Sequence, residues 1–241
     1  MRFMDELKTR FTTKEDIVFL DAMKTKETKT TTNRPYIISI EGNIGAGKST
    51  FVAELKILYA DRKDIVFLQE PVDAWAEITQ DGKTMLELFY ENQKKYSFAF
   101  QVMAYMSRLR MIKAEVEKAL ILSDTKIIVM ERSLDADRHI FAKMLYEDGM
   151  IEKCMYEIYQ LMSDDGLKEY SSDGIIWLNT GAEECHRRIA KRGREGEEMI
   201  GMEYLEKCDR YHGEWLKVFV GNPVFQVQLE TNDSHSMLTS V

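Results

Sequence analysis

Short apolar runs alternate with longer stretches of helical periodicity along most of the chain. Four of these runs are almost continuously apolar, which is typical of parallel strands that helices cover on both faces. A fifth run alternates apolar and polar residues, as an edge strand does. The predicted strands cover residues 36–40, 65–68, 127–130, 175–178 and 224–229.

Helical patterns fill the gaps between these runs. The predicted helices cover residues 49–60, 84–122, 135–147, 151–162, 183–191 and 202–219. Strands that alternate with helices build a parallel sheet, because each helix carries the chain back to the start of the next strand. The sequence therefore predicts an α/β fold of three layers, with a five-stranded parallel sheet and helices on both faces.

A glycine-rich loop joins the first predicted strand to the first predicted helix. Such a loop points backbone N–H groups at a phosphate, and the positive end of the following helix adds to the attraction. The lysine of the loop is expected to reach the β- and γ-phosphates, and the next hydroxyl to hold Mg²⁺. The sequence thus predicts a P-loop kinase fold that binds ATP or another nucleoside triphosphate. The residues that fit the pattern G-x-x-x-x-G-K-[ST] and its flank are Gly42, Asn43, Ile44, Gly45, Ala46, Gly47, Lys48, Ser49 and Thr50.

The amino-acid composition argues against some kinds of binding partner. The 241 residues carry a net charge of −8 and show no stripe of Lys and Arg with interleaved aromatics, so a nucleic-acid partner is disfavoured. No apolar run approaches the ~20 residues that cross a bilayer, so no membrane partner is expected. The three cysteines lack C-x-x-C spacing, and we expect buried reduced thiols in a cytoplasmic protein.

The first 34 residues differ in composition from the rest of the chain. They contain a Lys- and Thr-rich run over 24–33 and few apolar residues after Leu20. Such a segment cannot bury enough apolar surface to become ordered. We expect a flexible extension over residues 1–34 and one kinase domain over residues 35–241.

Polar residues follow the predicted strands, at the sheet edge where ligands of such folds bind. Glu70 follows the second strand, and Glu131 and Arg132 follow the third. We expect these two strands to flank the phosphate loop, which would bring the two acids together. The alternative is that each acid only caps the next helix.

Two further patterns each allow two interpretations. Gln101 and Arg108 share one helix face with Ala104, which leaves room for a flat ring, but a solvated helix face has the same pattern. A run of arginines ends one helix and precedes Glu197. It suits a lid over residues 188–200 that closes on phosphates, although charge runs are usually solvated.

These patterns, in this order, resemble the deoxynucleoside kinase family, in the branch nearest deoxycytidine, deoxyguanosine and deoxyadenosine kinases. The resemblance runs from about residue 35 to residue 229. In that branch the positions equivalent to Arg108 and Asp137 are also Arg and Asp, whereas the thymidine-accepting branch has apolar residues there. The stretches that carry the resemblance are 42–50, 70–75, 96–101, 107–110, 131–133, 137–141, 192–194 and 203–207.

The resemblance implies transfer of the γ-phosphate of ATP or another NTP to the 5′-hydroxyl of a deoxynucleoside, with dC or a purine deoxynucleoside preferred. Glu70 is implied as the base that takes the hydroxyl proton, and Glu131 as the acid near Mg²⁺, with Glu131 as the alternative proton acceptor. Lys48 and Arg132 complete the catalytic set. Homodimers are implied, with residues 150–162 and the start of 135–147 as the candidate interface.

The resemblance also implies which residues hold each substrate. On the donor side, the phosphates are implied to contact the loop with Arg188, Arg192 and Arg194, and Mg²⁺ to be held by Ser49 and Glu131. On the acceptor side, the implied residues are Glu70, Trp75, Tyr90, Gln101, Arg108, Arg132, Asp137, Phe141 and Glu197. Among them, Tyr90 and Glu197 would bond the sugar 3′-hydroxyl, Trp75 and Phe141 would sandwich the base, and Gln101 would bond the base edge.

The sequence departs from the family pattern in two places. Asp135 stands where relatives have an aromatic residue or histidine, which is expected to widen or repolarise the acceptor pocket. The chain continues for only a short stretch after the last predicted strand, so a final helix is expected to be missing or truncated, and the donor base would meet residues 230–233. Two other functions stay open: a nucleoside monophosphate kinase similar to thymidylate kinase, and a non-catalytic accessory subunit.

Overall fold

A central parallel sheet organises the chain in the computed structural model, which describes residues 34–122, 125–219 and 224–227. Its strands lie in the order β2-β5-β1-β6-β7, and every pairing is parallel. The predicted α/β fold with a parallel sheet between helices is confirmed. The strands are β1 (Tyr36–Glu41), β2 (Ile65–Leu68), β5 (Ile127–Glu131), β6 (Gly174–Leu178) and β7 (Val224–Val227).

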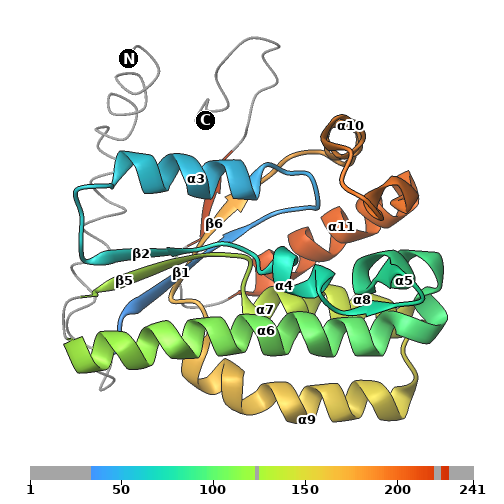
Figure 1. The fold of residues 1–241 in the computed structure, drawn as a ribbon, viewed down its shortest axis with the longest axis horizontal. Helices are drawn as coiled ribbons and strands as arrows, with labels where there is room; N and C mark the ends of the chain where they lie inside the picture. Colours follow the sequence, from blue (N-terminus) through green and yellow to red (C-terminus); the bar gives the residue numbers. More distant parts are fainter. Residues whose placement is uncertain (1–33, 123–124, 220–223, 228–241) are drawn as a thin grey trace.

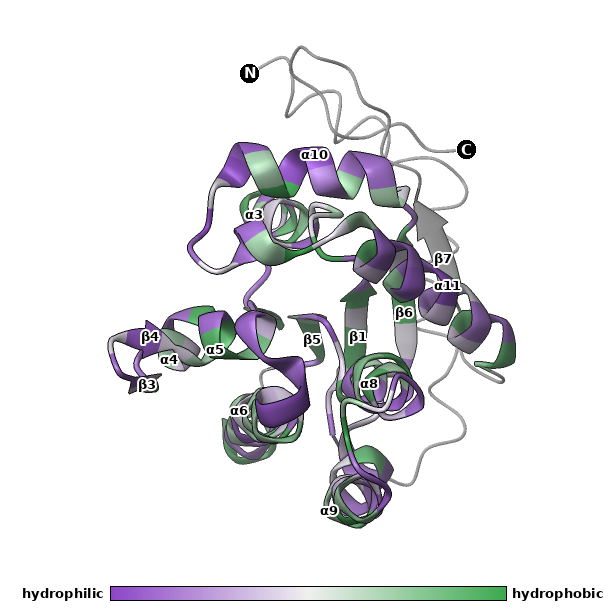
Figure 2. Cartoon of the chain, turned by 90° about the vertical axis from the view of Figure 1, so that its right-hand side faces the viewer, coloured by the Kyte–Doolittle hydropathy of each residue, from purple (hydrophilic) through white to green (hydrophobic). Residues whose placement is uncertain are grey.

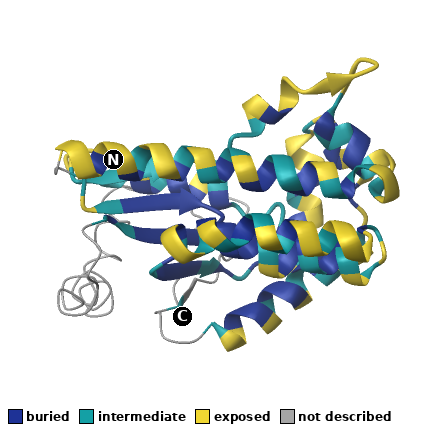
Figure 3. Ribbon diagram, turned by 90° about the horizontal axis from the view of Figure 1, so that it is seen from below, coloured by how far each residue is buried: buried dark blue, intermediate teal, exposed yellow. Residues whose placement is uncertain are grey.

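Helices cover both faces of this sheet (Figures 1 and 2). On one face α3 (Lys48–Leu58) and α10 (Ala182–Arg192) pack against Ile38 and Ile40 of β1. On the other face α6 (Gln93–Leu122) and α9 (Lys153–Tyr170) pack against Ile37. Alternate residues of β1 therefore enter different cores, and β1, β5 and β6 are largely buried between the layers (Figure 3).

The strand order corrects one prediction. The neighbours of β1 are β5 and β6, and β2 pairs with β5 on its other side. Glu70, which follows β2, is therefore not on a strand that flanks the phosphate loop. Glu131, at the end of β5, is on such a strand, because Ile40 of β1 lies opposite it.

The helical region predicted over 84–122 consists of two helices, α5 (Met85–Glu91) and α6. The chain turns at Asn92, which has the extended-type angles φ −146° and ψ 79°. A capping box starts α5: the Thr84 hydroxyl accepts from the Glu87 N–H, and the Glu87 carboxylate accepts from the Thr84 N–H. This break allows α5 to leave the axis of α6 and form one wall of a pocket.

Other helices also differ in detail from the prediction. The segment predicted over 135–147 is α7 (Leu134–Ala136), the π-helix η1 (Asp137–Ala142) and α8 (Lys143–Glu147) in succession. The helix predicted over 151–162 extends to Tyr170. The last long helix is α11 (Met202–Val218). The short elements that went unpredicted include α4 (Val72–Ala76) and the projecting hairpin of β3 (Thr79–Gln80) and β4 (Lys83–Thr84) (Figure 2).

Several predictions fall wholly or partly outside the described residues, namely those on residues 1–33, 228–229 and 230–233. Of the cysteines, Cys185 and Cys208 are buried as predicted, but Cys154 is exposed because it lies on the outer side of α9. Among the helices that the structure describes, none has the length and apolar character of a membrane span.

Candidate active site

The phosphate loop curls between β1 and α3. Gly47 is the residue before the helix, with a left-handed φ of 99°, and α3 begins at Lys48. A Cβ atom on Gly42 would lie 2.7 Å from the carbonyl oxygen of Leu178, and one on Gly45 would lie 2.6 Å from that of Cys185. Both residues have positive φ, so side chains are excluded by backbone angle and by space. The loop is thus wedged against β6 and α10.

Lys48 is folded back onto this loop. Its buried Nζ donates to the carbonyl oxygens of Gly42, at 3.2 Å, and Asn43, at 2.8 Å. Burial and the nearby Arg132 lower the pKa of Lys48 to about 8, although neighbouring carboxylates oppose the shift. The two loop carbonyl oxygens carry only partial negative charge. A bound phosphate would offer the Lys48 ammonium group a fully charged partner instead.

The hydroxyl of Ser49 donates to Oε1 of Glu131 at 2.7 Å, beside the phosphate loop. A hydroxyl and a carboxylate oxygen are ligands that Mg²⁺ accepts, and Mg²⁺ in kinases takes its other ligands from phosphates and water. Among the described residues there is no cluster of three or more His, Cys, Asp or Glu side chains able to hold a metal by themselves. The donor set therefore fits a metal that arrives with a nucleotide.

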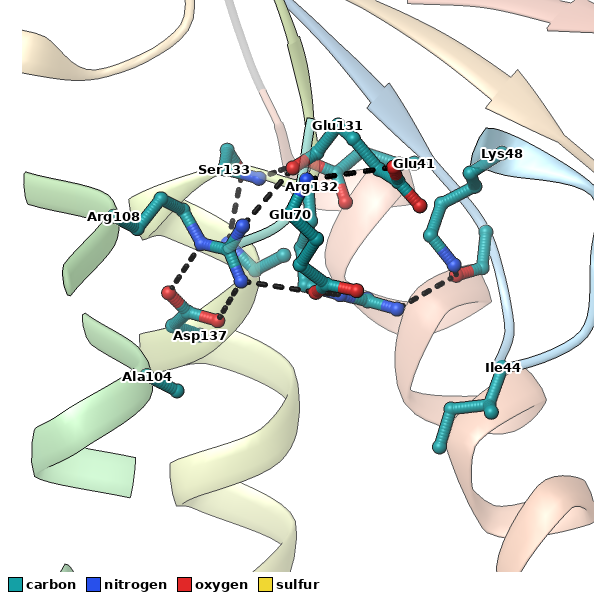
Figure 4. A network of polar contacts seen from close by, with 12 residues as sticks. Glu41, Ile44, Lys48, Glu70, Ala104, Arg108, Glu131, Arg132, Ser133 and Asp137 are labelled. Carbon is teal, nitrogen blue, oxygen red and sulfur yellow. Dashed lines mark hydrogen bonds and ion pairs between the residues drawn. The ribbon is translucent and has the colours of Figure 1, made fainter. Parts of the chain in front are cut away.

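Two arginines bind Glu70 (Figure 4). Nη2 of Arg108 donates to its Oε1 at 3.0 Å, and Nε of Arg132 donates to the same oxygen at 3.1 Å. Arg108 also bonds Asp137, with 2.8 Å between Nε and Oδ2, and its Nη1 donates to the carbonyl oxygen of Glu131 at 3.0 Å. The backbone N–H of Glu70 lies 3.5 Å from Oε2 of Glu131. The ends of β2 and β5 are thus joined through one polar network.

Neighbouring charges and burial shift the pKa values of the carboxyl groups in this network. Burial by itself would raise the pKa of Glu70, but Arg132, Arg108 and Lys48 outweigh it and lower that pKa to about 2. Burial raises the pKa of Asp137, and the adjacent Arg108 opposes the rise. Glu70 is therefore an ionised carboxylate at any ordinary pH.

A cavity of about 580 Å³, including its open mouth, lies beside the Glu70 carboxylate. All nine residues that the sequence assigned to the acceptor line it, together with Ile44 of the phosphate loop and Arg194 of the predicted lid. The nine come from the ends of β2 and β5 and from α4, α5, α6, η1 and η2 (Glu197–Met199).

Six residues line this cavity without having been predicted to contact a ligand: Val72, Leu86, Phe89, Phe100, Ala104 and Tyr204. Most are apolar residues at helical spacing, and no pattern distinguishes a cavity wall from a core contact. Ala104 was recognised only as a small residue between Gln101 and Arg108. Tyr204 lies in the first turn of α11, and its ring meets the Tyr90 ring edge-on, with 6.0 Å between centroids.

The predicted lid arginines have partners within the chain. Arg188 donates to Glu184 at 2.6 Å and to the carbonyl oxygen of Ala46 at 3.0 Å, which ties α10 to the phosphate loop. Arg192 and Arg194 both pair with the buried carboxylate of Glu197. All three arginines thus lie around the phosphate loop and the mouth of the cavity, with carboxylates as their present partners.

Asp135 does not lie in the cavity, which corrects the expectation that it changes the acceptor pocket. Its Oδ1 accepts from the Ser171 hydroxyl at 3.0 Å, and its Oδ2 accepts from the Ser172 N–H at 3.1 Å. The carboxylate is buried in the turn between α9 and β6. Its role there is structural, because it satisfies buried donors that lie away from the cavity.

Known proteins match this chain over most of its described residues. A family model, "Deoxynucleoside kinase", matches residues 38–239. Human deoxycytidine kinase is 39% identical over 196 residues, covering 74% of each chain. Mitochondrial deoxyguanosine kinase of Xenopus laevis is 32% identical over 194 residues, covering 74% of this chain and 72% of its own. Human mitochondrial thymidine kinase 2 is 31% identical over 183 residues, covering 75% of this chain and 64% of its own. The chain therefore belongs to the deoxynucleoside kinase family and is an ATP-dependent phosphotransferase.

Proposed function

We propose that this kinase transfers the γ-phosphate of ATP, or of another NTP, to the 5′-hydroxyl of deoxycytidine or a purine deoxynucleoside. The observation that carries the proposal is the position of Glu70. Its carboxylate lines the cavity, is ionised, and is joined through Arg132 to the carbonyl oxygen of Gly42 on the phosphate loop, at 3.4 Å from Nη2. A hydroxyl beside Glu70 would face the end of a nucleotide bound in that loop.

Glu70 acts as the proton acceptor in this proposal. A sugar hydroxyl is a poor nucleophile, and it becomes acidic only as its oxygen bonds to phosphorus. The low pKa of Glu70 makes it a weak base, so we expect the proton to move late in the transfer. Its two arginines hold the carboxylate in place while the substrate proton moves towards it.

Arg132 and Lys48 stabilise the transferred group. The Arg132 guanidinium lies between Glu70 and the phosphate loop and rests over the Phe141 ring, 4.4 Å from its centroid. Lys48 would exchange its two loop carbonyls for phosphate oxygens. Bound Mg²⁺ would neutralise phosphate charge, with Ser49 and Glu131 as its protein ligands. Arg188, Arg192 and Arg194 are proposed to turn to the phosphates when a nucleotide fills the loop.

The pair of Arg108 and Asp137 supports a preference against thymine. Both side chains are buried and line the cavity, as Gln101 does. The charged pair can bond cytosine or a purine at the base edge, whereas the methyl group of thymine would press on it and leave hydrogen bonds unmade. A site built to hydrogen-bond a ligand can reject the analogue that lacks those groups by roughly 10⁴-fold.

The remaining cavity residues support roles for the sugar and the ring. Tyr90 and Glu197 both line the cavity, and they suit the 3′-hydroxyl. Trp75 is held by a hydrogen bond of 2.8 Å from its Nε1 to the Ser107 hydroxyl, which fixes its ring against α6. It is proposed to cover one face of the base, with Phe141 on the other.

We also propose a homodimer through α9. The outer side of this helix exposes Met155, Ile158 and Leu161, with Met106 of α6 also exposed, and the two helices contact one another. At the start of the 135–147 segment, Asp135 and Ala136 are buried within the chain, so these two residues are not part of the proposed surface.

A coupled assay tests the proposed function directly. The purified protein is given ATP and Mg²⁺ with dC, dA, dG, dT or dTMP, and ADP release is measured alongside the mass of the product. Formation of dCMP, dAMP or dGMP is expected. Phosphorylation of dTMP alone would indicate a monophosphate kinase, and no turnover with any acceptor would indicate an accessory subunit.

A further inference from the structure

Arg132 adopts a backbone conformation that arginine seldom takes. Its φ is +62°, in the left-handed region. A non-glycine residue there costs of order 1–3 kcal/mol and persists only where the surroundings hold it. This conformation directs the guanidinium to Glu70 and to the carbonyl oxygen of Gly42. The contacts that hold this turn therefore also position the Arg132 guanidinium, which in the proposed function lies next to the reacting atoms.

Two consecutive residues of β1 hold this turn. The carbonyl oxygen of Ile40 accepts from the Arg132 N–H at 3.0 Å, and Oε1 of Glu41 accepts from the Ser133 N–H at 2.9 Å. Ser133 then caps α7, since its hydroxyl accepts from the Ala136 N–H at 3.0 Å. The first of these contacts is ordinary backbone pairing, whereas the second depends on one side chain.

Glu41 is otherwise without an assigned task. It is fully buried, it lies on the face of β1 that carries Ile37, and it precedes the first glycine of the phosphate loop. Its other oxygen, Oε2, has no hydrogen-bond partner among the described residues, and neither has Nη1 of Arg132. A buried carboxyl group with one unpartnered oxygen is costly, so its presence at this position calls for an explanation.

We propose that Glu41 is a positioning residue, whose Oε1 holds the Arg132–Ser133 turn so that the Arg132 guanidinium points at the transferred phosphate. Figure 4 shows Glu41 beside this turn and on the opposite side of the network from Asp137. The inference rests on the proposed function, because it assumes that Arg132 acts on the reacting group. Glu41 itself does not line the cavity.

Two conservative variants distinguish the length of the Glu41 side chain from its charge. Glu41→Gln keeps an oxygen at the same distance from the Ser133 N–H but removes the charge. Glu41→Asp keeps the charge but withdraws the oxygen by one methylene. Misplacement by about 1 Å can cost on the order of 10²-fold, so kcat of Glu41→Asp is expected to fall by roughly 10- to 10²-fold. Glu41→Gln is expected to keep kcat within about threefold, and KM for ATP should change little in both.

A double-mutant cycle tests whether the effect passes through Arg132. Lysine at position 132 cannot make the paired contacts of a guanidinium, so Arg132→Lys removes what Glu41 positions. In the Arg132→Lys background, Glu41→Asp is expected to lower kcat by less than about twofold. Glu54→Asp is the matched control: it changes a half-buried glutamate of α3 whose Oε2 is also unpartnered and which is absent from the network, and it should leave kcat unchanged.

The outcomes decide between this inference and its alternatives. Three results would each overturn the positioning role. The first is an equal fall in kcat for Glu41→Gln and Glu41→Asp, and the second is an unchanged kcat for Glu41→Asp. The third is a double-mutant cycle in which the effects of Glu41→Asp and Arg132→Lys on kcat multiply. An unmutated protein that phosphorylates no deoxynucleoside would contradict the proposed function instead. If the unmutated protein is active and Glu41→Asp has an unchanged kcat, only the positioning role is contradicted.

Discussion

The phosphate loop and the neighbouring cavity are built in different ways. The loop is nine consecutive residues, 42–50, and its binding groups are mostly backbone amides shaped by glycines. The cavity is lined by side chains from strand ends and from six helical elements that lie far apart in the sequence. Its polar groups, Glu70, Arg108, Arg132 and Asp137, hold one another in place.

This difference has consequences for mutation. A backbone cradle is insensitive to most side-chain changes but fails when a glycine or the lysine is replaced. A network of paired buried charges depends on each member, because removing one leaves another uncompensated. We therefore expect single substitutions in the cavity to affect both catalysis and stability, and the predictions below test that expectation.

The largest effect is expected for Glu70→Gln. Loss of the proton acceptor should lower kcat by roughly 10²–10⁴-fold, while the protein stays folded. Glu77→Gln, at an exposed glutamate just after α4, is the matched control and should leave kcat unchanged. Near-normal turnover of Glu70→Gln would mean that Glu131 or water takes the proton.

Removal of Asp137 should destabilise the fold. Asp137→Ala leaves the buried Arg108 without its shortest ion pair, and the free energy of unfolding is expected to fall by about 3 kcal/mol. Adding Arg108→Met should recover part of this loss, as measured by urea unfolding. In comparison, Glu91→Ala breaks an exposed pair with Lys83 and should change the free energy of unfolding far less. Equal costs at the two sites would contradict the proposed importance of the buried network.

The two regions should also differ in their dependence on pH. The pKa of Lys48 is about 8 in the free protein, so this lysine loses its charge as pH rises through that value. We expect kcat/KM for ATP to fall about tenfold per pH unit above it, since kcat/KM reports groups of the free enzyme. Glu70, with a pKa of about 2, should add no limb near neutral pH. An ATP profile that stays flat to pH 10 would contradict this assignment.

Substitutions on the outer surface of α9 are expected to affect the cavity least, because they act on the proposed dimer. Light scattering at micromolar concentration should report a dimer, and Ile158→Lys with Leu161→Lys should convert it to a monomer. Ile57→Lys places a charge at an exposed apolar residue of α3, on the opposite face of the sheet, and should leave the dimer intact. A monomer in the unmutated protein would rule out the proposed interface.

The sequence predicted the phosphate loop well because its signal is local. Glycines, lysine and serine at fixed spacing determine the turn, the helix start and the anion site together. The strands were predicted closely for a similar reason: buried parallel strands are continuous apolar runs. Strand order was harder, and β2 was expected beside β1 because no local pattern states which strands pair.

The cavity was predicted in membership but only partly in its contacts, since the Arg108–Asp137 pair and the Arg132–Glu70 contact were expected and are present. Sequence spacing put Gln101, Ala104 and Arg108 on one helix face, and resemblance supplied most of the rest. Nothing in the sequence indicated that Arg108 binds Glu70, since that contact joins residues 38 positions apart. Asp135 was placed in the pocket because it stands at a position where the family pattern has an aromatic residue or histidine. The turn of α7 into η1 directs the side chains of Asp135 and Asp137 to different partners.

The measurement that tests the account most directly is the ratio of kcat/KM for dC, dA or dG to that for dT. The unmutated protein should prefer at least one of the first three over dT. The variant Arg108→Met with Asp137→Ala should shift this ratio toward dT, whatever happens to the absolute rate when Glu70 loses one of its arginines. Equal or better activity on dT in the unmutated protein would show that Arg108 and Asp137 do not meet the base.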